Sequence, residues 1–259
     1  MPRWFGIWIL FGAFLAPAAQ LVDKLGVEGV RQFNAAYQAW DGSQFAAAAE
    51  LFRQATTNAP RSSTNFYWLG TAQFHRMLQI QYQPAARSNT LAANAAMESA
   101  ITALEQAVKL NARDGESHAL LGTLYGMKID GNLIRMARFG PRVAEHCKKA
   151  LEFGATNPRV QYLLGTCQFH TAKKAAAWRE ALATFLKAEE LYAGEAKTPA
   201  GPLEPRWGYD TCLTFIGRTC EQLGERNRAA DYYRKALAAR PGDRLASEGL
   251  ARVEKWHQN

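Results

Sequence analysis

Residues 67–75 read YWLGTAQFH and residues 162–170 read YLLGTCQFH, so seven of the nine positions in this stretch are identical. A weaker third copy, LLGTLY, lies between them at residues 120–125. Recurrence of one phrase along a chain is typical of proteins built from stacked structural repeats. We therefore expect a repeat protein in which each unit contacts mainly its neighbours.

The composition of the 259-residue chain favours helices throughout. Alanine is abundant, β-branched residues are sparse and prolines are confined to breaks, which suits α-helices better than strands. The formal net charge of +8 comes from lysines and arginines that are scattered along the chain. Because a nucleic-acid-binding surface needs a clustered basic stripe, nucleic acid is not expected as a partner.

The first 19 residues have the three parts of a secretory signal. Arg3 supplies a positive start, residues 4–16 are an apolar run, and residues 16–18 offer the small side chains of a cleavage site. The apolar run has 13 residues, whereas a membrane-spanning helix needs about 20. We expect a signal peptide at residues 1–19, a bacterial protein that is exported to the periplasm or secreted, and no membrane span after cleavage.

Four cysteines follow, at Cys147, Cys167, Cys212 and Cys220. Cys212 and Cys220 are eight residues apart on one predicted helix, which separates them by about 12 Å along its axis and prevents their pairing. A disulfide between Cys147 and Cys167 and four reduced core cysteines are both compatible with the spacing.

Residues 210–243 show the clearest helix-turn-helix pattern. Leu213, Ile216 and Gly217 follow the period of a first helix, and Gly224 marks the turn before a second helix that Pro241 ends. Five segments share this pattern, at 29–62, 63–114, 115–157, 158–196 and 210–243. Insertions are predicted near 76–97 and 128–142, a short lead-in at 20–28, and a C-terminal capping helix at 244–256.

These segments resemble the tetratricopeptide repeat (TPR), and the residues of the last segment that match the family pattern are Leu213, Ile216, Gly217, Cys220, Gly224, Ala229, Tyr233, Ala236 and Pro241. The resemblance implies an all-α fold, a TPR-type α-solenoid of helix-turn-helix repeats over residues 20–259. The phrases NPR at 157–159 and WGYD at 207–210 also resemble a group of exported bacterial TPR proteins of unassigned function.

The family resemblance implies that one stripe of each first helix faces a concave groove. With its flanking residues, the predicted partner-binding groove consists of Phe33, Tyr37, Trp40, Tyr67, Thr71, Phe74, His75, Thr123, Arg159, Tyr162, Thr166, Phe169 and His170. Aromatic area and hydroxyl groups of this kind suit an extended peptide or an amphipathic helix. The alternative interpretation is that these aromatics pack on the inserts or on neighbouring helices, or that a terminal helix folds back into the groove.

Two further features bear on the partner. The stripe lacks the lysine and asparagine of the carboxylate clamp found in chaperone-binding relatives, because Phe33 and Tyr37, or Tyr67 and Thr71, stand at those positions. An acidic C-terminal tail is therefore not expected. The insert at 132–142 mixes apolar residues with three arginines; a lid, a contact for an anionic partner and a solvated helix-loop are all compatible with it.

The sequence offers no recognisable catalytic, cofactor-binding or metal-binding residues. The five histidines do not form HxxxH or HExxH, and neither GxSxG nor a phosphate-binding loop is present. We therefore predict a non-catalytic protein–protein interaction scaffold that binds a protein or peptide. The alternatives are a structural subunit of an envelope assembly that uses its convex face or edges, and an enzyme accessory protein or cryptic hydrolase.

Overall fold

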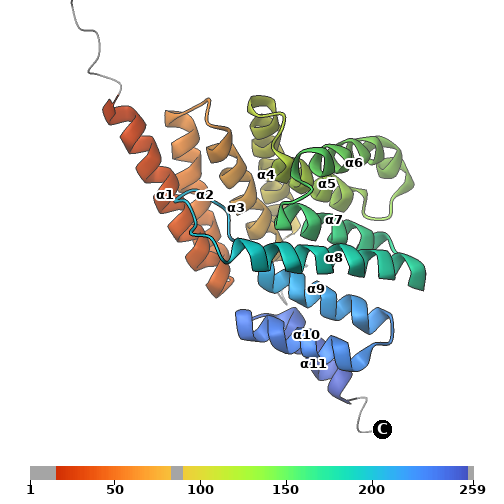
Figure 1. Cartoon of the computed structure of the whole chain (residues 1–259). Coiled ribbons are helices and arrows are strands. Elements are labelled where there is room, and N and C mark those ends of the chain that lie inside the picture. Colours follow the sequence, from red (N-terminus) through yellow and green to blue (C-terminus); the bar gives the residue numbers. More distant parts are fainter. Residues whose placement is uncertain (1–15, 83–89, 256–259) are drawn as a thin grey trace, which may run out of the picture.

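The structure, a computed structural model, describes residues 16–82 and 90–255 (Figure 1). These residues contain eleven α-helices and no strand, which confirms the all-α prediction. The helices are α1 (Ala16–Ala39), α2 (Gly42–Asn58), α3 (Ser63–Gln81), α4 (Thr90–Leu110), α5 (Gly115–Ile129), α6 (Leu133–Gly154), α7 (Pro158–Thr171), α8 (Ala175–Glu195), α9 (Tyr209–Gln222), α10 (Arg226–Ala239) and α11 (Arg244–Lys255).

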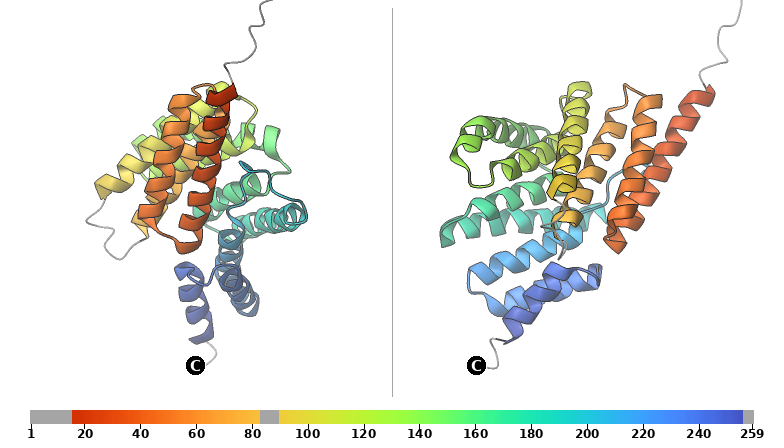
Figure 2. Two further views of the ribbon diagram at one scale, coloured as in Figure 1. Left: turned by 90° about the vertical axis from the view of Figure 1, so that its left-hand side faces the viewer. Right: turned by 180° about the vertical axis from the view of Figure 1, so that it is seen from behind.

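Successive helices form five antiparallel pairs, from α1/α2 to α9/α10, and α11 packs on the last pair. The first two pairs stand nearly upright in Figure 1, whereas α7 to α10 run across the view, so the stack turns as it proceeds. Figure 2 shows the same change of direction from two other sides. The expected α-solenoid of helix-turn-helix units is therefore present.

Small residues on one helix allow each pair to pack closely. A Cβ added to Gly165 of α7 would lie 2.7 Å from the Phe185 ring of α8. At Gly217 of α9, the corresponding distance to the Tyr233 ring of α10 is 2.8 Å. Both contacts are shorter than carbon atoms tolerate, so the repeated glycine sets the helix–helix distance within a pair.

Side-chain caps define where several helices begin. Asp114 accepts hydrogen bonds from the backbone N–H groups of Glu116 and Ser117 at the start of α5. Asn157 does the same for Arg159 and Val160 at the start of α7. These caps satisfy N–H groups that a helix cannot pair internally. They also fix the first turns of α5 and α7, which carry the charged residues described below.

Three local features differ from the sequence-based expectation. Residues 20–28 are part of α1 and not a lead-in. The insert near 76–97 lengthens α3 to Gln81 and starts α4 at Thr90, and its middle, residues 83–89, lies outside the described residues. The insert at 128–142 forms the turn between α5 and α6 and the first part of α6. The predicted signal peptide falls largely on residues 1–15, which also lie outside the described residues.

No helix among residues 16–82 and 90–255 is long and apolar enough to cross a membrane. The four cysteines are free. The thiols of Cys147 on α6 and Cys167 on α7 share a hydrogen bond, which lowers the pKa of Cys167 to about 7 and raises the pKa of Cys147. Cys212 and Cys220 are buried core residues. They do not form a disulfide with each other, in agreement with their spacing along one helix.

The first and last helix pairs contact each other. The Tyr37 hydroxyl of α1 donates to Asp210 of α9 at 2.8 Å. Arg240, at the end of α10, binds Asp210 and Asp243 and lies over the Trp40 ring, 4.8 Å from its centre. The inner face of the stack is therefore closed by its own ends.

Candidate functional site

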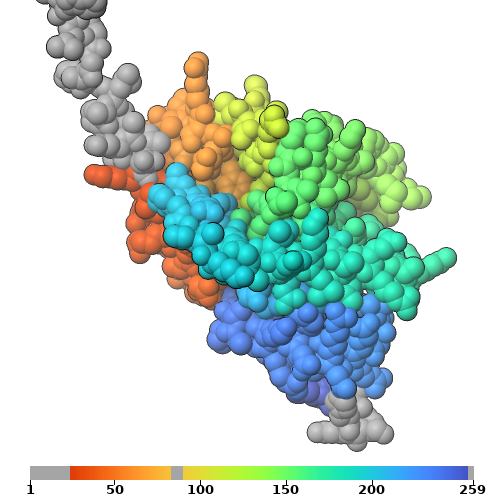
Figure 3. All heavy atoms as spheres, viewed as in Figure 1, coloured from red at the N-terminus to blue at the C-terminus, as the bar shows by residue number. Residues whose placement is uncertain are grey.

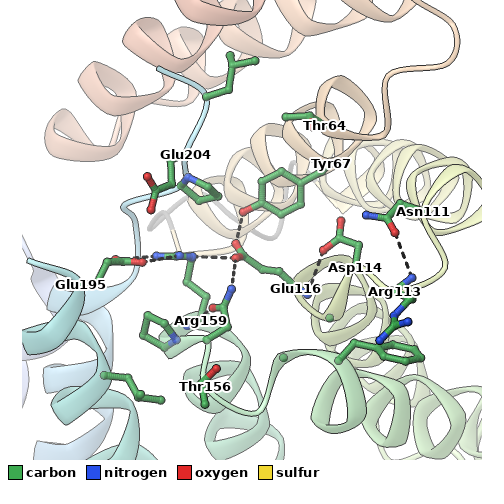
Figure 4. A pocket seen from close by; sticks show the side chains of 18 of the residues that line it. Thr64, Tyr67, Asn111, Arg113, Asp114, Glu116, Thr156, Arg159, Glu195 and Glu204 are labelled. Atoms are coloured by element: carbon green, nitrogen blue, oxygen red, sulfur yellow. Dashed lines mark hydrogen bonds and ion pairs between the residues drawn. The ribbon is translucent and has the colours of Figure 1, made fainter. Parts of the chain in front are cut away.

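A cavity of about 920 Å³ opens where the first turns of α3, α5 and α7 meet the end of α8 and the segment 196–208. Figure 4 shows Tyr67, Glu116 and Arg159 at its base, with Glu195 and Glu204 on one side and Asp114 on the other. Its walls come from three successive repeats, so its shape depends on how these repeats stack.

A buried ion network forms the base of the cavity. Arg159 donates through Nε to Glu116 at 2.9 Å and through both terminal nitrogens to Glu195 at 2.9 and 2.6 Å. Glu116 also accepts from the Tyr67 hydroxyl and from Asn157 Nδ2 at 2.9 Å. Arg159 and Glu116 have only 4% and 6% of their side chains exposed. Charges this deeply buried are tolerated because each is paired and hydrogen-bonded.

The network holds Arg159 in its charged form. Burial alone would lower the pKa of Arg159, but the Glu116 carboxylate and the hydrogen bonds to Glu195 raise it above its usual value. Burial and the neighbouring Glu116 also raise the pKa of the Tyr67 hydroxyl far above its usual value. Both groups therefore act as fixed hydrogen-bond donors at neutral pH and not as proton-transfer groups.

The lining of the cavity is acidic overall. It includes five carboxylates, of Asp114, Glu116, Glu190, Glu195 and Glu204, and two guanidinium groups, of Arg113 and Arg159. Within the described part of the chain, Glu190 is exposed and forms no ion pair. Glu204 is 44% exposed and is paired with Arg206 at 3.0 Å. The cavity therefore favours a cation over an anion.

Five predicted groove residues form one aromatic cluster that is largely buried. Phe33, Tyr37, Phe74 and His75 are at most 5% exposed, and Trp40 is half-buried. The rings of Phe33, Tyr37 and Phe74 lie 5.1 to 5.3 Å from the His75 ring. Edge-to-face contacts at such distances are typical of packed cores.

The second copy of the phrase is also packed inside. Tyr162 contacts the rings of Phe185, Trp207 and Phe215, and Phe169 contacts Phe215 at 5.5 Å. Tyr162 is 6% and Phe169 9% exposed. Of the predicted groove residues in this copy, His170 is the exposed one, at the end of α7. The duplicated phrase is therefore mainly a packing motif.

The three predicted threonine donors bind their own helices. Thr71, Thr123 and Thr166 each donate to the carbonyl four residues earlier, at 2.9 Å. This local bond is a common alternative for threonine within a helix. Their hydroxyl protons are consequently not directed at a partner.

The segment 196–208 covers the aromatic stripe. Trp207 lies with its ring 4.9 Å from that of His75 and donates through Nε1 to the Tyr67 hydroxyl at 2.9 Å. The Leu203 carbonyl accepts from Trp68 Nε1 at 2.9 Å. Figure 3 shows this segment lying across the face between α1 and α8. The expectation of an open aromatic groove is therefore wrong for this structure, because the chain fills the groove itself. Tyr67 and Arg159 are the predicted groove residues that line the open cavity.

Burial of His75 predicts acid sensitivity. Burial lowers the pKa of His75 to about 3 from its usual 6.5, so the unfolded chain binds a proton at this site more readily than the folded chain. The free energy of unfolding is therefore unaffected by this group above pH 6.5 and falls as pH drops toward 3. The loss amounts to about 3 kcal/mol near pH 4.

We therefore measure the free energy of unfolding in urea at neutral pH and near pH 4. The decrease between the two pH values should be smaller for His75→Phe than for the wild type. The matched control is His170→Phe, because His170 is exposed on the second copy of the phrase. An equal loss in the wild type and in His75→Phe would contradict the prediction.

Several important residues were not identified from the sequence. Glu116, Glu195 and Trp207 lie outside the predicted stripe, two at helix ends and one in the segment between α8 and α9. The tryptophan between the fourth and fifth helix pairs was the available signal, because a large aromatic ring is rarely left in solvent. Within the described residues, no group of three or more His, Cys, Asp or Glu side chains could hold a metal ion.

Comparison with known proteins supports the architecture. A sequence model of the tetratricopeptide repeat matches residues 211–243. TTC0263, a thermophilic TPR protein of Thermus thermophilus, is 15% identical and has a TM-score of 0.58 over 87% of this chain and 98% of its own. A chain of the APC/C hetero-tetramer Cut9–Hcn1 is 16% identical, with a TM-score of 0.61 over 93% of this chain and 39% of its own. No curated protein matches the sequence.

Proposed function

We propose that this chain, a tetratricopeptide-repeat solenoid, is a non-catalytic scaffold that binds a protein partner through a basic segment of that partner. The binding site is the acidic cavity between the first turns of α3, α5 and α7 and the segment 196–208. The observation that carries the proposal is an open cavity whose carboxylates outnumber its guanidinium groups by five to two.

Contacts within the chain hold the cavity walls in place. Its base is held by the Arg159 network, and the segment 196–208 is attached through Trp68 and Tyr67. A preformed site loses little conformational entropy when a partner binds, which favours affinity. The volume of about 920 Å³ has room for several side chains of a peptide.

The unpaired charge lies at the rim. Glu190 is exposed at the cavity edge and, within the described residues, forms no ion pair, whereas Glu204 is exposed beside it and paired with Arg206. Glu116 and Glu195 are occupied by Arg159. A lysine or arginine side chain that enters the cavity would meet the rim carboxylates first, and this arrangement favours fast association with a basic partner. The buried network holds the cavity walls in place. Its carboxylates are paired with Arg159 and do not bind the charge of the ligand.

Export is part of the proposal. It is supported by the positive start, the apolar run and the small residues of positions 1–19. A cytoplasmic location of the full chain in fractionated cells, with residues 1–19 still attached, would contradict it.

The binding proposal is tested with a nine-residue random peptide library that has one fixed position. We expect the chain to retain peptides with fixed lysine or arginine and to discard those with fixed glutamate. We expect Glu190→Gln combined with Glu204→Gln to weaken the retained peptides by about tenfold, because each partly exposed ion pair contributes about 0.5–1 kcal/mol.

The matched control is Glu180→Gln, which removes an exposed carboxylate of the same helix, α8, outside the cavity. This variant should bind like the wild type. Retention without preference for a basic residue, or an equal loss in Glu180→Gln, would place binding elsewhere and overturn the proposal.

A further inference from the structure

The start of α6 presents apolar side chains to solvent. Leu133, Ile134 and Met136 are 78%, 82% and 48% exposed. They follow directly on the turn between α5 and α6, which lies at the right-hand edge of the molecule in Figure 1. In an ordinary surface helix the apolar side faces the core. The first turn of α6 instead exposes its apolar side chains to solvent.

Helix geometry shows how these side chains are distributed. Successive residues turn by about 100° around the axis, so Leu133 and Ile134 point about 120° and 140° away from Phe139. Phe139 is the residue that anchors this part of α6, with its ring 5.9 Å from Tyr125. The exposed apolar residues therefore cannot turn inward without unwinding the helix.

Positive charge flanks the apolar tip. Residues 128–142 contain four basic residues and one acidic residue, Asp130. Arg135 and Arg138 are exposed, and within the part of the chain that the structure describes neither forms an ion pair. Arg142 lies beside them on the helix, 3.1 Å from the Tyr125 hydroxyl and 3.8 Å from Glu105.

We propose that this tip, residues 131–138, binds the surface of a bilayer that contains anionic phospholipids. Leu133, Ile134 and Met136 enter the boundary between headgroups and acyl chains, and Arg135 and Arg138 bind lipid phosphates. Apolar side chains combined with flanking arginines are the pattern of interfacial membrane contacts.

A bilayer fits this tip better than a protein does. At about 100° per residue the apolar residues cover about 160° of the helix circumference, which forms one continuous apolar face. They lie at a turn between two helices, where a flat membrane surface can reach them. The exposed arginines without ion pairs supply the complementary charge for lipid phosphates.

The test uses the full chain with an environment-sensitive fluorescent amino acid at position 134. We expect a blue shift, and quenching by acyl-chain nitroxide lipids, with vesicles of phosphatidylcholine and phosphatidylglycerol. With phosphatidylcholine alone we expect neither. The local probe separates the tip from residues 1–15, and the same probe at Leu91, which is 87% exposed, is the matched control.

Binding should depend on both kinds of residue. Arg135→Gln with Arg138→Gln is expected to weaken vesicle binding detected by the position-134 probe on the order of 25-fold, from about fivefold for each arginine. Leu133→Ser with Ile134→Ser should abolish quenching of a probe at position 136. Far-UV circular dichroism should stay unchanged, because these side chains are exposed.

Three outcomes would overturn the proposal. The first is an unchanged probe at position 134 with anionic vesicles. The second is equal quenching at positions 91 and 134, which would show that another part of the chain holds the membrane. The third is a probe that responds to polyglutamate but not to vesicles, which would identify the tip as a contact for an acidic protein.

Discussion

Replacing Arg159 by methionine is expected to lower the free energy of unfolding by about 4 kcal/mol, because removal of one partner from a buried ion pair leaves an uncompensated charge. In this case two carboxylates lose their partner, since Arg159 binds both Glu116 and Glu195. Arg206 is the other cation near Glu195, at 3.9 Å. Methionine keeps much of the arginine's apolar stem, so most of the loss reflects charge and hydrogen bonding.

The measurement is urea unfolding followed by circular dichroism and fluorescence, whose transitions must coincide for the free energies to be comparable. Arg53→Met is the control, because Arg53 forms an exposed ion pair with Glu50 one turn away, and such pairs contribute about 0.5 kcal/mol. Adding Glu116→Gln to Arg159→Met should recover part of the loss. Similar losses for Arg159→Met and Arg53→Met would show that the network does not stabilise the fold.

The helical pairs could be predicted from the sequence because their causes are local. The glycine of each phrase and the alanines and large side chains of the following helix recur at helical spacing, as with Gly217 and Tyr233. Breaks at Pro60 and Pro241 mark helix ends. A pattern repeated five times defines the phase of the units even where insertions lengthen the helices.

The candidate site could not be predicted because its contacts join distant parts of the chain. Trp207 and Tyr67 are 140 positions apart, and Arg159 and Glu116 are 43 apart. Periodicity determines which side of a helix is apolar, but not which neighbouring segment covers it. The same aromatic stripe is consistent with an open groove and with a covered one. The segment 196–208 decides between these two, because Trp207 and Leu203 pack on the stripe.

The acidic cavity could not be predicted from the sequence for the same reason. Asp114 and Asn157 cap the starts of α5 and α7. Their position on one cavity follows only from the stacking of α3, α5 and α7. Helix starts that are separate in sequence become neighbours in a solenoid because each repeat places its first helix on the same side.

Replacing Trp207 by alanine is expected to lower the free energy of unfolding by about 4 kcal/mol, the usual loss for a large aromatic side chain removed from a core. Trp207 is 3% exposed, contacts the rings of His75 and Tyr162, and donates to the Tyr67 hydroxyl. Trp207→Phe is the control, because it keeps an aromatic ring and loses the hydrogen bond, for an expected loss of about 1 kcal/mol. Equal losses in the two variants would show that the ring contributes little.

The same substitution links the stripe to the cavity. Trp207 fixes the segment 196–208, and Leu203, Glu204 and Pro205 of that segment form one wall of the cavity. Release of the segment would expose the aromatic stripe and remove a rim carboxylate together. We therefore expect Trp207→Ala to weaken binding of basic peptides by at least the roughly tenfold predicted for the rim variant, and to increase binding of an apolar dye, whereas Trp207→Phe changes neither. Unchanged peptide binding in a folded Trp207→Ala protein would mean that the other walls of the cavity suffice.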